Sequence, residues 1–180
     1  MTARCPVTGN RGRPVPATTL QSLLRDEHMP AASGRDWFFC DLADCHVVYF
    51  TADGKTFSKG ALKIRVGAKD TEPPRPVCYC FGHTVESIRE EIARTGRSTV
   101  AASISAKVKA GECSCETLNP IGTCCLGDVK RVVKDALASF DRQRPESTAT
   151  TDPKEGATHE CCNVSSDVLP ARAATPASGS

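Results

Sequence analysis

The chain has 180 residues, a formal net charge of +2 and few aromatic residues, so it can form one ordinary domain with a tail or a small second unit. Its lysines and arginines are scattered rather than massed, which argues against a nucleic-acid partner. The first 13 residues are polar and basic, and no stretch approaches the roughly 18 apolar residues of a membrane span. We therefore expect a cytoplasmic protein with no signal peptide and no membrane span.

The cysteines carry most of the chemical information. There are 11 of them, an odd number, in a chain that we expect to meet a reducing environment. Under those conditions cysteines more often bind metals than form disulfides. The alternative, a secreted disulfide scaffold, is disfavoured by the absence of a signal peptide.

The first 70 residues are predicted to form a small antiparallel β unit with one helix. Residues 1–17 are expected to be a loop. Thr18 or Thr19 suits a helix cap, and the leucines that follow share one helical face. Short apolar runs and an alternating pattern predict four extended segments, at residues 36–40, 47–50, 56–57 and 62–66.

The next part of the chain, residues 71–142, is predicted to be helical. A proline-rich linker leads to a helix capped by Thr84 and ended by Gly96. Apolar spacing predicts a second helix around residues 100–108 and a clear amphipathic helix over 127–140. Residues 143–180 are rich in Pro, Ser, Thr, Ala and Gly, which predicts a disordered tail. The predicted fold class is α+β.

The first candidate metal site combines Cys5 with Cys40 and Cys45. This arrangement is similar to the two knuckles of a zinc ribbon, but zinc prefers four ligands and Thr8 stands where the fourth cysteine would be. The fourth ligand is then His46, Asp41, Asp44 or water. The alternative is that these cysteines are small buried apolar residues.

The second candidate site is formed by two cysteine-rich loops that flank the predicted helices of residues 84–108. The first loop holds Cys78 and Cys80. Two thiols on one side of an extended segment can bind one iron of a [2Fe–2S] cluster, with the other iron held by the second loop. Spacing alone leaves a second zinc site, or thiols kept for redox switching, as alternatives. The second loop holds Cys113, Cys115, Cys124 and Cys125.

Several separated motifs resemble the N-terminal domain of the CopZ-type copper chaperones, whose second half is similar to the bacterioferritin-associated ferredoxin (BFD-like) fold. The resemblance covers roughly residues 3–140. The motifs are Cys5-Pro6, Phe39-Cys40-x4-Cys45, Val47-Val48-Tyr49-Phe50, Lys59-Gly60-x-Leu62-Lys63-x-Arg65-Val66-Gly67, Pro76-Val77-Cys78-Tyr79-Cys80 and Asn119-Pro120-x-Gly122-x-Cys124-Cys125.

The resemblance implies one zinc ion and one [2Fe–2S] cluster. It implies that zinc is held by Cys5, Cys40 and Cys45 and the cluster by Cys78, Cys80, Cys115 and Cys125. Cys113 and Cys124 are then extra thiols, each able to replace its neighbour. A full chaperone of this type continues into a heavy-metal-associated domain with a Cys-x-x-Cys motif. The sequence holds no such motif, so direct copper delivery is not implied.

The expected function is one-electron transfer in copper or other metal handling, including reduction of the metal ion. Metal-pathway proteins or an electron donor or acceptor would be its partners. The alternative is a metal or redox sensor, or adaptor, whose zinc and cluster are structural. The dispersed histidines speak against a hydrolase, so an enzyme is the less favoured class. In the tail, Cys161 and Cys162 are interpreted as an incidental exposed pair, or as scavengers of soft metals.

Overall fold

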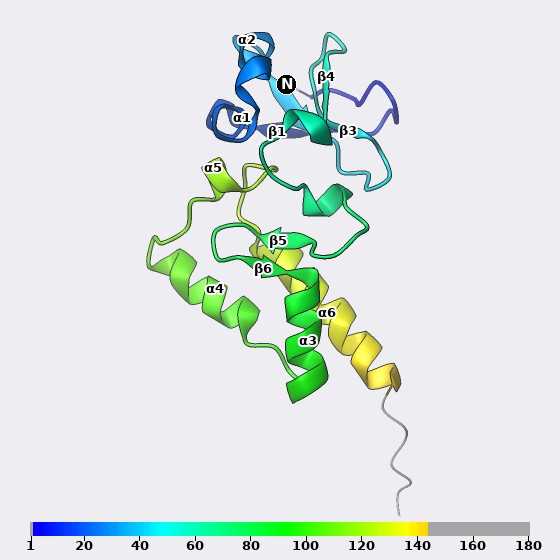
Figure 1. The fold of residues 1–180 in the computed structure, drawn as a ribbon, viewed down its shortest axis with the longest axis vertical. Helices are drawn as coiled ribbons and strands as arrows, with labels where there is room; N and C mark the ends of the chain where they lie inside the picture. Colours follow the sequence, from blue (N-terminus) through cyan, green and yellow to red (C-terminus); the bar gives the residue numbers. More distant parts are fainter. Residues whose placement is uncertain (1, 144–180) are drawn as a thin grey trace, which may run out of the picture. The chain divides into compact units, whose positions relative to one another are not determined.

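The N-terminal part of the chain is built on a four-stranded antiparallel sheet (Figure 1). The computed structural model describes residues 2–143, so the tail expected over 143–180, with Cys161 and Cys162, lies outside the described residues apart from Gln143. The strands follow one another in the order in which the chain makes them. They are β1 (Arg13–Val15), β2 (Trp37–Phe39), β3 (Val47–Phe50) and β4 (Thr56–Ser58).

Strand β1 was missed by the sequence, which predicted a loop over residues 1–17. It pairs antiparallel with β2, and Pro14 lies opposite Phe38. A proline cannot donate a hydrogen bond to a neighbouring strand, and β1 avoids this cost because it is an edge strand. Only the non-local pairing with β2 reveals the strand.

Short helices cover this sheet and connect its strands. They are α1 (Ala17–Leu23), η1 (Asp26–His28), α2 (Met29–Ala32), η2 (Lys59–Ala61) and η3 (Gly67–Lys69). The strand predicted at 62–66 is wrong, although its burial alternates. Leu62 makes only an isolated bridge to Leu24, and the chain then turns into η3. Thr19 is likewise not a helix cap, because Pro16 occupies that position.

The second part of the chain begins with a small hairpin and continues as helices. The hairpin is β5 (Pro76–Cys78) and β6 (His83–Thr84), which the sequence did not predict. The sequence predicted three helices between residues 84 and 140, of which the middle one was the weakest. All three are confirmed. They are α3 (Val85–Thr95), α4 (Val100–Lys109) and α6 (Leu126–Gln143), with the short α5 (Cys115–Leu118) before the last.

Local capping explains where α3 begins and ends. The Thr84 hydroxyl accepts a hydrogen bond from the Ser87 amide, and the Ser87 hydroxyl accepts one from the Thr84 amide. Gly96 ends the helix in the left-handed conformation, at φ 70°. Both α3 and α4 pack on α6, and their apolar residues, among them Ile88, Ile104 and Val129, form one core.

The α+β class is therefore confirmed, with the antiparallel sheet first and the helices after it. The boundary near residue 70 stays a prediction. Side chains of the sheet half reach residues of the helical half at several points, including Tyr49 to Pro120. Among the described residues, no helix is long and apolar enough to cross a membrane.

Candidate metal centres

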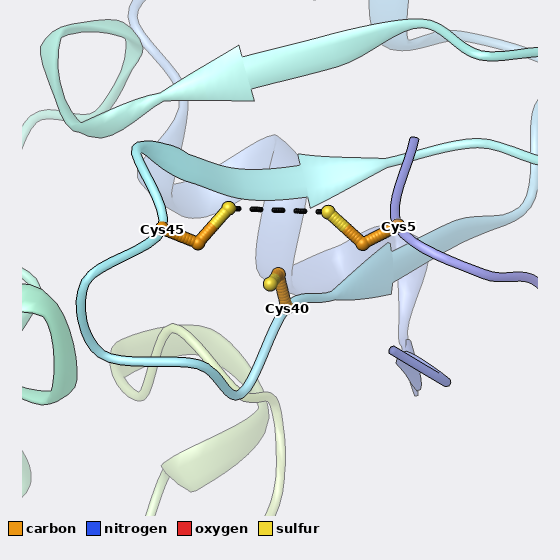
Figure 2. Close-up of side chains that lie close together, drawn as sticks. All are labelled: Cys5, Cys40 and Cys45. Atoms are coloured by element: carbon orange, nitrogen blue, oxygen red, sulfur yellow. Dashed lines mark hydrogen bonds between the residues drawn. The ribbon is translucent and has the colours of Figure 1, made fainter. Parts of the chain in front are cut away.

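The structure brings Cys5, Cys40 and Cys45 together. Their sulfur atoms all lie within 4.8 Å of one another. Figure 2 shows the three side chains pointing toward one another from the N-terminal segment and from the two ends of the β2–β3 connection. The sulfurs of Cys5 and Cys45 are 3.9 Å apart, and all three side chains are buried.

Backbone hydrogen bonds fix these three residues. The amide of Cys5 donates to the Asn10 carbonyl oxygen at 2.8 Å, which closes a tight turn over residues 5–10. The amide of Cys40 donates to Val48 at the end of the β2–β3 pairing, at 3.0 Å. Between Cys40 and Cys45 the loop is held by the buried Lys69, whose Nζ donates to the Leu42 carbonyl oxygen.

The electrostatics of the three thiols favour a metal thiolate at Cys5. Burial raises the pKa of Cys5, but hydrogen bonding with Thr8, Val7 and Cys40 together outweighs it and brings the pKa to about 7. Burial raises the pKa of Cys45. One thiol is thus poised to ionise at neutral pH, and a bound cation would favour ionisation of the others.

The residues that the sequence offered as a fourth zinc ligand lie elsewhere. The described residues that converge here are the three cysteines alone, without His46, Asp41 or Asp44. Asp41 forms an ion pair with Arg13, with 2.7 Å between its Oδ1 and the Arg13 Nε. By contrast, the Thr8 hydroxyl lies 4.0 Å from the Cys40 sulfur.

The four cysteines expected to hold the cluster also lie in one region. Cys78, Cys80, Cys115 and Cys125 belong to the same apolar cluster between the hairpin and the helices, and all but Cys80 are buried. Cys78 ends β5, Cys115 begins α5 and Cys125 directly precedes α6. The amide of Val129 donates to the Cys125 carbonyl oxygen, so Cys125 lies at the positive end of a long helix dipole.

Thiols of the two loops influence one another in this region. The sulfurs of Cys80 and Cys115 are 3.5 Å apart. Cys78 interacts with Cys125, and this hydrogen bond lowers the pKa of Cys78 to about 6 and raises that of Cys125. Burial raises the pKa of Cys115 to about 12. That Cys78 and Cys80 share one iron stays a prediction.

A buried asparagine that the sequence analysis did not single out shapes the second loop. The side chain of Asn119 donates to the Thr123 carbonyl oxygen at 2.7 Å and accepts from the Ile121 amide at 3.1 Å. Asn119 is 2 % exposed. Its place in an Asn-Pro-x-Gly turn is the signal that could have identified it.

The extra thiols differ in exposure. Cys113 is half-buried and Cys124 is exposed, whereas their proposed ligand neighbours Cys115 and Cys125 are buried. The amide of Ser114, between Cys113 and Cys115, donates to the Cys80 sulfur at 3.3 Å. Backbone amides directed at sulfur stabilise thiolates, which suits Cys80 to metal binding.

Comparisons with known proteins agree with this geometry. Residues 2–63 match the zinc-binding domain model of the CopZ family (zf_CopZ). A solved structure, the N-terminal domain of CopZ from Archaeoglobus fulgidus, is 34% identical with a TM-score of 0.61, over 72% of this chain and 96% of that one. The chain belongs to the CopZ N-terminal-domain family. Residues 2–63 are its zinc-binding domain, and the three converging thiols lie in it.

A full-length relative extends further than this match. The copper chaperone CopZ of Archaeoglobus fulgidus is 35% identical over 129 residues, which is 72% of this chain and 61% of that protein. The match therefore spans less than two thirds of the CopZ chaperone's length.

Proposed function

We propose that this CopZ-family protein is a metal-handling protein that transfers single electrons through a [2Fe–2S] cluster beside its zinc site. Cys5, Cys40 and Cys45 hold zinc, and Cys78, Cys80, Cys115 and Cys125 hold the cluster. A metal-pathway protein, or an electron donor or acceptor, is the expected partner in the cytoplasm. The relative named a copper chaperone makes copper the first metal to test.

The observation that carries this proposal is the meeting of four thiols from two distant loops in one apolar region. The sulfurs of Cys80 in the hairpin and Cys115 in the second loop are 3.5 Å apart, and Cys78 and Cys125 belong to the same cluster. Four thiolates, two for each iron, are the ligand set of a two-iron cluster. A second zinc site would instead gather all four sulfurs around a single centre.

The surroundings of the four thiols also suit electron transfer. A bound [2Fe–2S] cluster would supply one-electron redox chemistry between its oxidised and reduced forms. The helix dipole of α6 at Cys125 and the amide of Ser114 at Cys80 stabilise negative charge. The pKa of Cys78 is lowered mainly by Cys125 and in smaller part by the positive charge of Lys107, which lies over the ring of Phe81 at 4.5 Å.

The decisive experiment is purification of the full chain without oxygen, followed by metal analysis and reductive titration. We expect about two irons and one zinc per chain, visible thiolate-to-iron bands, and reversible bleaching by one electron. A colourless protein with zinc alone would contradict the proposal. A cluster that cannot be reduced reversibly would favour the sensor or adaptor role, in which metal occupancy is the signal.

Single Cys→Ser variants test the ligand assignment. Serine at position 78, 80, 115 or 125 should abolish or strongly weaken the cluster absorbance. Serine at Cys113 or Cys124 serves as the matched control, because each lies one or two residues from a proposed ligand and should leave the spectrum intact. Loss of the cluster in Cys113→Ser but not in Cys115→Ser would mean that Cys113 is the ligand and Cys115 the extra thiol.

A further inference from the structure

The zinc-binding domain contributes three buried thiols and leaves the fourth corner of a tetrahedral site to another residue. Zinc in structural sites is almost always four-coordinate. In this chain the tight turn that begins at Cys5 reaches Thr8, three residues later, where its hydroxyl faces the Cys40 sulfur.

The distances fit a site of three sulfurs and one oxygen. With zinc–sulfur bonds of about 2.3 Å, two sulfurs on one tetrahedral zinc lie about 3.8 Å apart. The sulfurs of Cys5 and Cys45 are 3.9 Å apart. With a zinc–oxygen bond of about 2.1 Å, a sulfur and an oxygen on one zinc lie about 3.6 Å apart. The Thr8 hydroxyl is 4.0 Å from the Cys40 sulfur, so a shift of a few tenths of an ångström suffices.

The fourth coordination position, beside Thr8, is also the one most accessible to solvent. Cys5, Cys40 and Cys45 are each at most 6 % exposed, whereas Thr8 is half-buried and Val7, beside it, is 54 % exposed. A carboxylate at this corner would bind zinc firmly, but Asp41 is paired with Arg13 and does not converge with the three thiols. A neutral hydroxyl is a much weaker zinc ligand than a thiolate.

We propose that Thr8 closes the zinc site with its hydroxyl oxygen, and that this corner is where a thiolate from a partner molecule enters. In the exchange a metal–sulfur bond forms and the metal–oxygen bond to the neutral Thr8 hydroxyl breaks. The hydroxyl keeps its proton, and no electron moves. The domain then holds its metal in an exchangeable site, open to thiol-bearing metal-pathway partners. This inference rests on the zinc-binding role of residues 2–63 and not on the cluster.

The test is zinc-edge X-ray absorption of the full-length protein, which counts sulfur ligands of zinc without interference from iron. Wild-type protein should show three sulfurs and one oxygen, and Thr8→Cys should show four sulfurs. Addition of 2-mercaptoethanol as the probe thiol should raise the sulfur count of wild type to four and leave that of Thr8→Cys unchanged. Four sulfurs in untreated wild type, or a sulfur count in untreated Thr8→Cys that is no higher than in wild type, would overturn the proposal.

The rate of zinc loss to excess EDTA provides a second measurement, followed by elemental analysis. Zinc loss from Thr8→Cys should be slower than from wild type by a factor of about ten or more. Thr8→Val keeps the side-chain volume but removes the oxygen, so it should lose zinc faster than wild type. Thr8→Ser should behave like wild type. Asp41→Asn is the matched control, and a lower ligand count or faster release in that variant would assign the corner to Asp41 instead. A purified protein without zinc would contradict the zinc-binding role itself.

Discussion

The hydroxyl of Tyr49 donates a hydrogen bond of 2.7 Å to the carbonyl oxygen of Pro120, 71 residues further along the chain. Both groups are buried, and Tyr49 is fully so. The bond joins the centre of β3 to the Asn-Pro-x-Gly turn that precedes Cys124 and Cys125. Because the hydroxyl is desolvated, the pKa of Tyr49 is raised, and it stays a donor at all ordinary pH values.

Tyr49→Phe should destabilise the protein, because it removes the donor and leaves the buried Pro120 carbonyl unpaired. A buried acceptor without a partner costs about 1–3 kcal/mol. Denaturant unfolding of the two proteins measures the difference. Iron retention on dilution should also fall, since the turn that presents Cys125 loses one of its anchors. Wild-type stability in the phenylalanine variant would show that the bond contributes nothing net.

Gly122→Ala should be severely destabilising. Gly122 has φ 71°, and a Cβ there would lie 2.5 Å from Pro16 and 2.7 Å from the Thr19 hydroxyl. The left-handed conformation alone costs an alanine about 1–2 kcal/mol. The matched control is Gly111→Ala, because Gly111 has φ 76° but open space around its Cβ position. We expect Gly122→Ala to lose clearly more unfolding free energy than Gly111→Ala. Equal losses would mean that α1, which contains Thr19, can move away from the added Cβ at little cost.

Stability should depend on acid pH through Glu91, which links α3 to the start of α4. Its carboxylate accepts from the Ser98 hydroxyl at 2.6 Å and from the Thr99 amide at 3.0 Å. These bonds, led by Ser98, lower the pKa of Glu91 from its ordinary 4.5. Because the folded pKa is depressed, the contribution is full above pH 4.5 and is lost as the pH falls through the lowered value.

Glu91→Gln should therefore lower the free energy of unfolding by about 1–2 kcal/mol at neutral pH. The loss should be much smaller at pH values well below 4. Glu90→Gln is the control, since it removes the same charge from an exposed neighbour. Unfolding by urea at several pH values separates the two variants. A difference in unfolding free energy between Glu91→Gln and wild type that does not change with pH would contradict the proposed role of the carboxylate.

Lys107→Gln should lower the reduction potential of the proposed cluster. The lysine charge acts on Cys78, and reduction adds negative charge there, so the cation favours the reduced form. Lys109→Gln removes an equal charge from an exposed position two residues away and should shift the potential less. Potentiometric titration followed by visible absorbance compares them. Equal shifts would mean that only net charge matters.

The sequence predicted what depends on neighbouring residues. The Thr84 cap, the Gly96 stop and the apolar stripe of α6 are local patterns, and each appears where it was expected. The convergence of Cys5, Cys40 and Cys45 is a contact between distant residues, and the spacing of a zinc knuckle was enough to suggest it.

What the sequence missed depends on partners far along the chain. Strand β1 and the β5–β6 hairpin exist through their pairing, which no short window contains. The sulfur of Cys80 likewise lies 3.5 Å from that of Cys115, 35 residues away, and no short window contains this contact. The sequence also did not indicate that the Thr8 hydroxyl lies 4.0 Å from the Cys40 sulfur, 32 residues away.

The segment Cys78-Tyr79-Cys80 directs its thiols toward the helices, while the Tyr79 hydroxyl accepts from the Gly67 amide and donates to the Arg65 carbonyl oxygen in the first half. This short segment therefore carries two proposed cluster ligands together with an anchor to the half that holds the zinc-binding thiols. Occupancy of either centre should then favour occupancy of its neighbour, by the same factor in both directions. In a cell short of zinc, the protein should therefore also retain its proposed iron–sulfur cluster less tightly.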